Sequence, residues 1–122
     1  MSASLVGSEM CIRDSHKTMN QVELFKALSN PIRLQILTWL KDPSAYFPPQ
    51  GLHIPEGDSF ENAVCVGSIQ EKLGISQSTV SHYLDLMQRS GLLESARFGK
   101  WTYYRRNEAN IQALAEFIKT EL

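Results

Sequence analysis

Residues 75–87 read ISQSTVSHYLDLM and predict a short amphipathic helix. At about 100° per residue, its apolar side chains fall on one face and its polar side chains on the other. The apolar face comprises Val80, Tyr83, Leu84 and Met87. We therefore expect one face to be buried in a core and the other to be exposed.

The exposed front end of this helix has the chemistry of a DNA-reading element. Ser76 can cap the helix by accepting from the amide of Ser78 or Thr79, which leaves the positive end of the helix dipole facing outward. Asp85, on the same outer face, would be repelled by phosphates unless the helix enters a groove by its tip. Glutamine and serine side chains hydrogen-bond base edges in the major groove. The candidate base readers are Gln77, Ser78, Ser81 and His82, with Thr79 near a phosphate. The pattern alone is equally consistent with an amphipathic helix whose polar face is merely solvated.

Downstream, residues 92–106 read LLESARFGKWTYYRR and predict two strands around a turn at Gly99-Lys100. This hairpin carries four cations, Arg97, Lys100, Arg105 and Arg106, against Glu94 as its acid. We expect Arg97 and Lys100 to hold the DNA backbone or the minor groove. In the alternative interpretation, the cations only protect a strand edge from aggregation.

Upstream, residues 66–73 predict a brief helix that Gly74 ends. A helix, a glycine turn, a capped helix and a hairpin then follow in order. A small shared core is expected from Ile69, Leu73, Ile75, Val80 and Leu84. This is the packing of a helix-turn-helix.

Between Leu24 and about Arg106, the chain resembles the ArsR-type family of winged helix-turn-helix transcriptional repressors. Residues 27–37 resemble the family segment ALxxPxRLxIL, residues 76–84 its recognition helix SQSTVSHHL, and residues 91–104 its wing GLvxxrxeGrxxyY. The resemblance implies a mainly α fold with a small β-hairpin, namely a winged helix-turn-helix. The chain departs at Tyr83, where the family often has a second His; we expect altered packing there, with no loss of DNA contact.

Composition and charge fit a small DNA-binding domain without requiring one. The 122 residues suffice for one core, and the net charge is −1. Residues 67–106 hold six Lys/Arg against three Asp/Glu, a net charge of +3, whereas residues 42–66 hold four acids and no Lys or Arg. We expect DNA binding that weakens steeply with salt.

The sequence predicts a cytoplasmic protein with no membrane segment. No apolar run approaches the roughly 18 residues of a membrane span, and no cationic segment followed by an apolar stretch suggests secretion. Cys11 and Cys65 do not form a disulfide framework and should remain thiols.

Residues 1–18 are predicted to be a disordered or non-native leader that precedes a domain over residues 19–122. Residues 5–15, LVGSEMCIRDS, resemble the translated adapter sequence that contaminates some assembled reading frames, so Met19 is expected to be closer to the biological start. The alternative is a genuine arm in which Arg13 and Lys17 reach a DNA groove.

Apolar residues recur along the two terminal helices that the pattern predicts. The first contains Met19, Val22, Phe25 and Leu28, and the last, capped by Asn107, contains Ile111, Leu114, Phe117, Ile118 and Leu122. Between them, Asn30 and Pro31 begin another helix, with core positions at Ile32, Ile36, Leu37 and Leu40. The terminal stripes exceed what the central core can cover, so we expect a homodimer through the N- and C-terminal helices. Such a dimer would place two recognition helices about one turn apart on palindromic double-stranded DNA. Alternatively, both stripes fold onto their own domain.

No metal site and no cofactor are predicted. The resemblance implies a Cys-Val-Cys metal motif in many family members, but this chain has Cys65-Val66-Gly67. Another family site uses histidines on the last helix, where residues 107–122 have none. Cys65 is interpreted as a buried small apolar residue or, alternatively, as a redox or effector site.

Residues 42–64 are longer than the usual family connection between these helices. Their prolines exclude a continuous helix. They are nevertheless too apolar for a plain linker, with Tyr46, Phe47, Leu52, Ile54 and Phe60. We hypothesise that this insertion contributes to a ligand pocket or a dimer contact; the alternative is an excursion that only covers core.

The sequence thus predicts a non-enzymatic, homodimeric DNA-binding repressor, released by an unidentified small-molecule or redox signal. It contains no catalytic triad pattern and no phosphate-binding glycine loop. The competing interpretation is a winged-helix module that binds an acidic protein. The small polar groups of residues 76–82 argue against it, because protein interfaces favour aromatic anchors.

Overall fold

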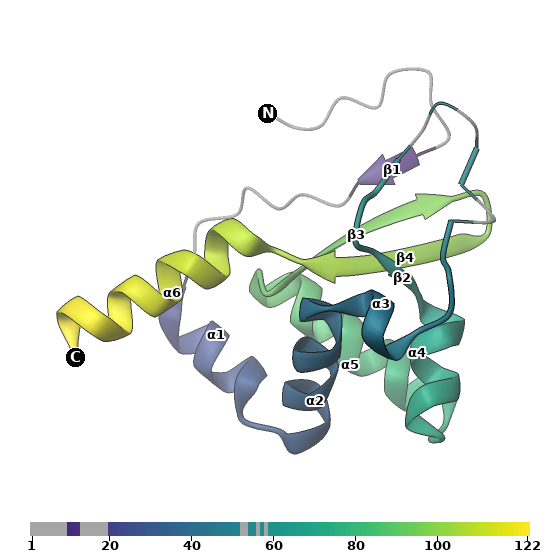
Figure 1. Cartoon of the computed structure of the whole chain (residues 1–122). Coiled ribbons are helices and arrows are strands. Elements are labelled where there is room, and N and C mark those ends of the chain that lie inside the picture. Colours follow the sequence, from purple (N-terminus) through teal and green to yellow (C-terminus); the bar gives the residue numbers. More distant parts are fainter. Residues whose placement is uncertain (1–9, 13–19, 52–53, 56, 58) are drawn as a thin grey trace.

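The computed structural model describes residues 10–12, 20–51, 54–55, 57 and 59–122. Its helices are α1 (Gln21–Leu28), α2 (Pro31–Lys41), α3 (Pro43–Tyr46), α4 (Val66–Leu73), α5 (Gln77–Ser90) and α6 (Glu108–Glu121), and its strands are β1 (Met10–Ile12), β2 (Val64–Cys65), β3 (Leu93–Phe98) and β4 (Trp101–Arg106). Figure 1 shows a helical layer beneath a small sheet, with α6 extending away from both. No helix in this part of the chain is long and apolar enough to cross a membrane.

Side-chain caps begin the first two helices. Asn20 Oδ1 accepts from the amide of Glu23 at 3.1 Å, and Asn30 Oδ1 accepts from the amides of Ile32 and Arg33 at 2.8 and 3.0 Å. Pro31 stands in the first turn of α2, where it has no amide hydrogen to leave unpaired. The cap predicted at Asn30 is confirmed.

The helix-turn-helix forms at the predicted residues. Gly74 ends α4 in a left-handed conformation with φ of 70°. Ser76 then caps α5, its Oγ accepting from the amide of Thr79 at 3.3 Å. Gly91 ends α5 with φ of 98°. This is the winged helix-turn-helix expected from the sequence.

The wing belongs to an antiparallel sheet in the order β1-β3-β4-β2. β3 and β4 pair around Gly99, which has a φ of 63°, with Phe98 opposite Trp101. β2 pairs with β4, and β1 pairs with β3. Residues 10–12, predicted to be part of a disordered or non-native leader, form a strand in the structure. The other residues of the leader lie outside the described residues.

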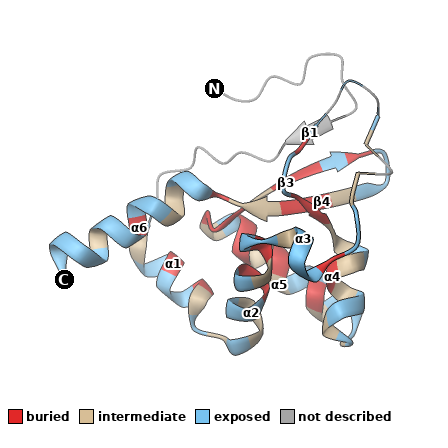
Figure 2. Ribbon diagram, viewed as in Figure 1, coloured by how far each residue is buried: buried red, intermediate tan, exposed pale blue. Residues whose placement is uncertain are grey.

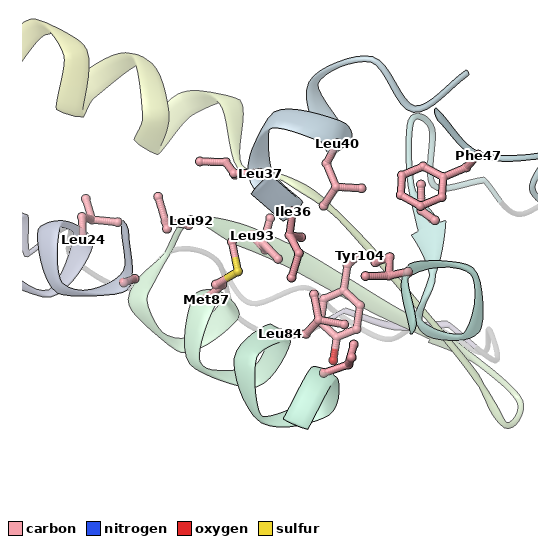
Figure 3. Packing of buried hydrophobic residues seen from close by; sticks show 14 of the residues in the cluster. Leu24, Ile36, Leu37, Leu40, Phe47, Leu84, Met87, Leu92, Leu93 and Tyr104 are labelled. Atoms are coloured by element: carbon pink, nitrogen blue, oxygen red, sulfur yellow. The ribbon is translucent and has the colours of Figure 1, made fainter. Parts of the chain in front are cut away.

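One apolar cluster joins the helices to the sheet. It contains Ile69, Val80 and Leu84 of the helix-turn-helix, each fully buried. The predicted Leu73 and Ile75 pack against it while partly exposed. Figure 3 shows Ile36 and Leu40 of α2 converging with Leu84 and Met87 of α5 beside Tyr104 of β4. This core fixes α5 with its polar face outward.

The terminal helices bury few residues, as Figure 2 shows for α6. α1 buries Leu24 and Ala27 but leaves Val22 and Phe25 60% and 37% exposed. α6 buries Leu114 alone, whereas Ile118 and Leu122 are 46% and 81% exposed. Val22 and Phe25 of the predicted recurrence therefore lie on the outward side of α1, whereas Leu28 packs against the core that contains Leu24 and Ala27. Met19 lies outside the described residues.

The insertion forms α3 and a second apolar cluster. Phe60 and Ala63 pack with Ala96, Phe98 and Tyr103 of the wing. Phe47 joins the main core, and Ile54 packs partly buried against the second cluster. Tyr46 is 43% exposed. Leu52 and His53 lie outside the described residues.

Gly91→Ala is expected to destabilise the protein by about 1–3 kcal/mol, because φ at this position favours glycine. A Cβ there would also lie 2.8 Å from Asn110 Nδ2, which donates to Gly91 O. Urea denaturation measures the change. Gly99→Ala is the matched control, since its φ is also positive but a Cβ would meet nothing within 4 Å. Equal losses in both variants would show that the Asn110 contact contributes nothing.

Candidate nucleic-acid interface

The tip of α5 presents the predicted base readers to solvent. Gln77, Ser78, Ser81 and His82 are exposed, and Thr79 is half-buried. Their register follows from the burial of Val80 and Leu84, because residues beside these on the helical wheel point outward. The structure therefore brings these five side chains together on one accessible end of the helix.

Hydroxyl groups at the tip hydrogen-bond one another. Ser76 Oγ donates to Thr79 Oγ1 at 2.8 Å and lies 3.4 Å from Ser78 Oγ. Together with the Thr79 amide, these contacts hold the first turn in one conformation. A preformed turn loses less conformational entropy when it binds a ligand.

Asp85 forms an ion pair on its own helix. Its Oδ2 accepts from Arg89 Nε at 2.8 Å. The i,i+4 spacing of the two residues is the sequence signal for this pair. The pairing reduces the repulsion that Asp85 would exert on a phosphate, so the charge of Asp85 does not by itself require the helix to enter a groove by its tip.

Tyr83 is half-buried and lies between two neighbours. Its ring centroid is 6.1 Å from that of His82, and Arg33 Cζ lies 5.2 Å from it. Arg33 Nε also donates to Ala27 O at 2.8 Å, at the end of α1. Arg33 thus links α1 to α5. This contact was not predicted, because no sequence pattern near Arg33 indicates it.

The wing cations divide into two pairs. Arg105 Nε donates to Glu94 Oε1 at 2.9 Å, and Arg106 binds Glu108 through two nitrogens at 2.9 and 3.1 Å. These two guanidinium groups stabilise the base of the wing.

The other pair lies near the turn. Arg97 Nε donates to Gly99 O at 2.8 Å, and Lys100 Nζ lies 5.5 Å from the Trp101 ring centroid. Both cations are exposed, as is 38% of Trp101. In Figure 1 this turn and the α4–α5 turn lie on the same side of the view, opposite the end of α6. Arg97 and Lys100 are thus the wing cations that the turn presents to solvent.

Cys65 occupies the N-cap position of α4 and is half-buried, packing against the second apolar cluster, so its interpretation as a buried small apolar residue holds in part. Its Sγ lies 3.3 Å from Ser68 Oγ, and its amide donates to Gln50 Oε1 at 3.0 Å. Within the part of the chain that the structure describes, no three His, Cys, Asp or Glu side chains gather as metal ligands would.

Comparison with known proteins gives consistent matches. Residues 60–95 match the family described as "Bacterial regulatory protein, arsR family". The HTH-type transcriptional regulator YbzH of Bacillus subtilis is 50% identical over 85% of this chain and 100% of its own length. The biofilm growth-associated repressor of Xylella fastidiosa (strain Temecula1) is 30% identical over 91% of this chain and 82% of its own. The solved structure of HlyU from Vibrio cholerae superposes with a TM-score of 0.56 at 28% identity, covering 80% of this chain and 85% of that one.

Proposed function

Because this chain belongs to the ArsR family of bacterial regulators and is a DNA-binding transcriptional regulator, we propose that it is a homodimeric repressor of a palindromic operator. The proposal that the protein represses transcription is supported by the relative in Xylella fastidiosa, which is named a repressor. Its place of action is the cytoplasm, where it meets double-stranded DNA.

The exposed polar tip of α5 is the single observation that carries this proposal. Gln77, Ser78, Ser81 and His82 contact base edges in the major groove, and Thr79 lies near a phosphate. Arg97 and Lys100 hold the backbone or the minor groove beside it. The ion pairs of Arg105 and Arg106 leave those two cations less suited to bind phosphate.

The homodimer forms through the outward faces of α1 and α6. Val22 and Phe25 on α1 and Ile118 and Leu122 on α6 leave apolar surface exposed in the protomer. Burial of apolar surface contributes about 25 cal/mol per Å², so a second copy that covers these faces stabilises the assembly. Symmetry then presents two recognition helices to the two half-sites of a palindrome.

An effector releases the repressor from its operator in this proposal. A cleft of about 450 Å³ lies where the insertion meets β4 and the start of α6, with Asp42, Glu61, Arg105 and Arg106 among its lining residues. A small polar molecule is the ligand class that suits such a charged lining. Cys65 is the candidate for a redox signal, since it is a free cysteine that is only partly buried.

Gln77→Ala is expected to cost about 1–3 kcal/mol of operator binding and to relax base preference at one position in each half-site. The reason is that a glutamine amide makes two hydrogen bonds to one adenine. Operators are selected from random DNA, and gel-shift titrations then measure the affinity for each single-base variant.

Lys100→Ala is the matched control, because a phosphate contact is independent of sequence. It should weaken binding to all sequences alike and lower the salt slope by about 1. If the wild-type protein selects no DNA and its weak binding shows no preference for a palindrome, the proposal fails in favour of a protein-binding winged helix.

A further inference from the structure

The insertion contacts both the helix-turn-helix and the wing. Its described residues leave α2, form α3 beside α4, and then run along the β3–β4 hairpin to β2, as Figure 1 shows. We call the described residues between 43 and 63 the brace, and we name its contacts with α4 the helix end and its contacts with the hairpin the wing end.

At the helix end, the brace holds the first helix of the helix-turn-helix. Lys72 Nζ of α4 lies 5.8 Å from the Tyr46 ring centroid and 5.2 Å from that of Trp39. An ammonium group over two aromatic faces is held by the negative face of each ring. Gln50 adds a polar contact, because its Oε1 accepts from the Cys65 amide and its Nε2 donates to Ser68 Oγ at 3.3 Å.

At the wing end, the brace supplies the wing with its own core. Phe60 is 5% exposed and packs with Phe98 and Tyr103, whose rings meet edge to face at 5.8 Å. Arg105 of β4 lies over Phe60, with its Cζ 4.0 Å from the ring centroid, and its Nη1 donates to Glu61 O at 3.4 Å. These contacts form a cluster separate from the main core.

This arrangement bears on DNA recognition because the main core holds the hairpin through Leu93 and Tyr104, whereas Phe98, next to the turn, packs on the brace. A hairpin end without such packing is free to twist. A protein that contacts DNA with a helix tip and with a wing binds tightly only when the two contacts keep the spacing of the grooves. The brace touches the wing directly, through Arg105 of β4, and reaches α5 through α4, which packs against it.

We propose that the brace fixes the wing relative to α5 and thereby determines how much the phosphate contacts of the wing add to DNA affinity. Tyr46, Gln50 and Phe60 are the positioning residues; they act through α4 and the hairpin and do not touch DNA. The proposal rests on the DNA contacts of the proposed function, but it concerns different residues.

The test removes the contacts of the brace at one end, at the other end, and at both ends together. Phe60→Ala removes the contacts at the wing end, and Tyr46→Ala combined with Gln50→Ala removes those at the helix end. Each is expected to lower operator affinity about tenfold, by a similar factor for every sequence, and to lower the salt slope as Lys100→Ala does. If the loss of either end is enough to release the wing, the triple variant should also lose about tenfold in operator affinity. Two independent contributions would instead multiply to a loss of about a hundredfold. Phe60→Leu, which keeps an apolar side chain against Phe98, should restore most of the affinity.

A spectroscopic measurement separates positioning from general damage. The chain has two tryptophans, Trp39 at the helix end and Trp101 on the wing. In protein labelled with fluorotryptophan, the helix-end variant should shift or broaden the ¹⁹F signal of Trp101 as well as that of Trp39. Tyr46 is exposed and Gln50 half-buried, so this variant should keep its core intact.

A hundredfold loss in the triple variant, a salt slope equal to that of the wild type in both single-end variants, or a Trp101 signal unmoved by the helix-end variant would each overturn the proposal. If the wild-type protein selects no operator, it is the proposed function that fails, and the Trp101 signal still decides whether the brace couples the two elements.

Discussion

Ile118→Glu is expected to convert the proposed homodimer to a monomer and to lower operator affinity about a thousandfold. Ile118 is 46% exposed in the protomer and lies on the apolar face of α6, so a carboxylate there costs the protomer little but must be desolvated in the dimer. A monomer binds one half-site and loses the effective concentration that the dimer gives to the second. Sedimentation equilibrium measures the assembly, and gel-shift titration measures the affinity.

Gln112→Glu is the control for added charge, because Gln112 is exposed on another side of the same helix. It should leave both the mass and the operator affinity near wild type. A dimeric Ile118→Glu protein with unchanged affinity would place the dimer contact away from this face of α6.

Leu84→Ala is expected to lower the free energy of unfolding by about 2–5 kcal/mol. Leu84 of α5 is fully buried in the cluster that joins the helices to the sheet. Its truncation therefore leaves a cavity that its neighbours fill only in part. Urea denaturation at one fixed protein concentration measures the change, since the stability of a dimer depends on concentration.

Ser81→Ala separates the two faces of α5 in the same experiment. Ser81 is exposed, so its loss should change stability by no more than about 0.5 kcal/mol while weakening operator binding. A loss below about 1 kcal/mol in Leu84→Ala would mean that this side chain can be replaced without opening a cavity.

Much of the fold could be predicted from the sequence because its signals are local. Ser76 and Asn107 cap helices, and Gly74 and Gly91 end them, each through contacts within a few residues. The outward face of α5 could be predicted in the same way, since it follows from the spacing of Val80 and Leu84.

Contacts between distant segments could not be predicted. Nothing near Arg33 signals that it reaches Tyr83, and nothing near Phe60 signals that it packs under Phe98. The insertion was predicted either to contribute to a ligand pocket or a dimer contact, or only to cover core. In the structure it lines a cleft on one side and packs against the wing on the other. Which residues contact DNA stays a prediction until an operator is measured.

The flanking strands of the sheet bear on how this protein behaves when crowded. A bare β3–β4 hairpin has an unpaired row of amides and carbonyls along each side, and such rows recruit strands from other molecules. β2 pairs along β4, and β1 pairs along β3, so part of each row is already satisfied within the chain. The covered parts of these two edges are thereby less available to pair with strands of other molecules.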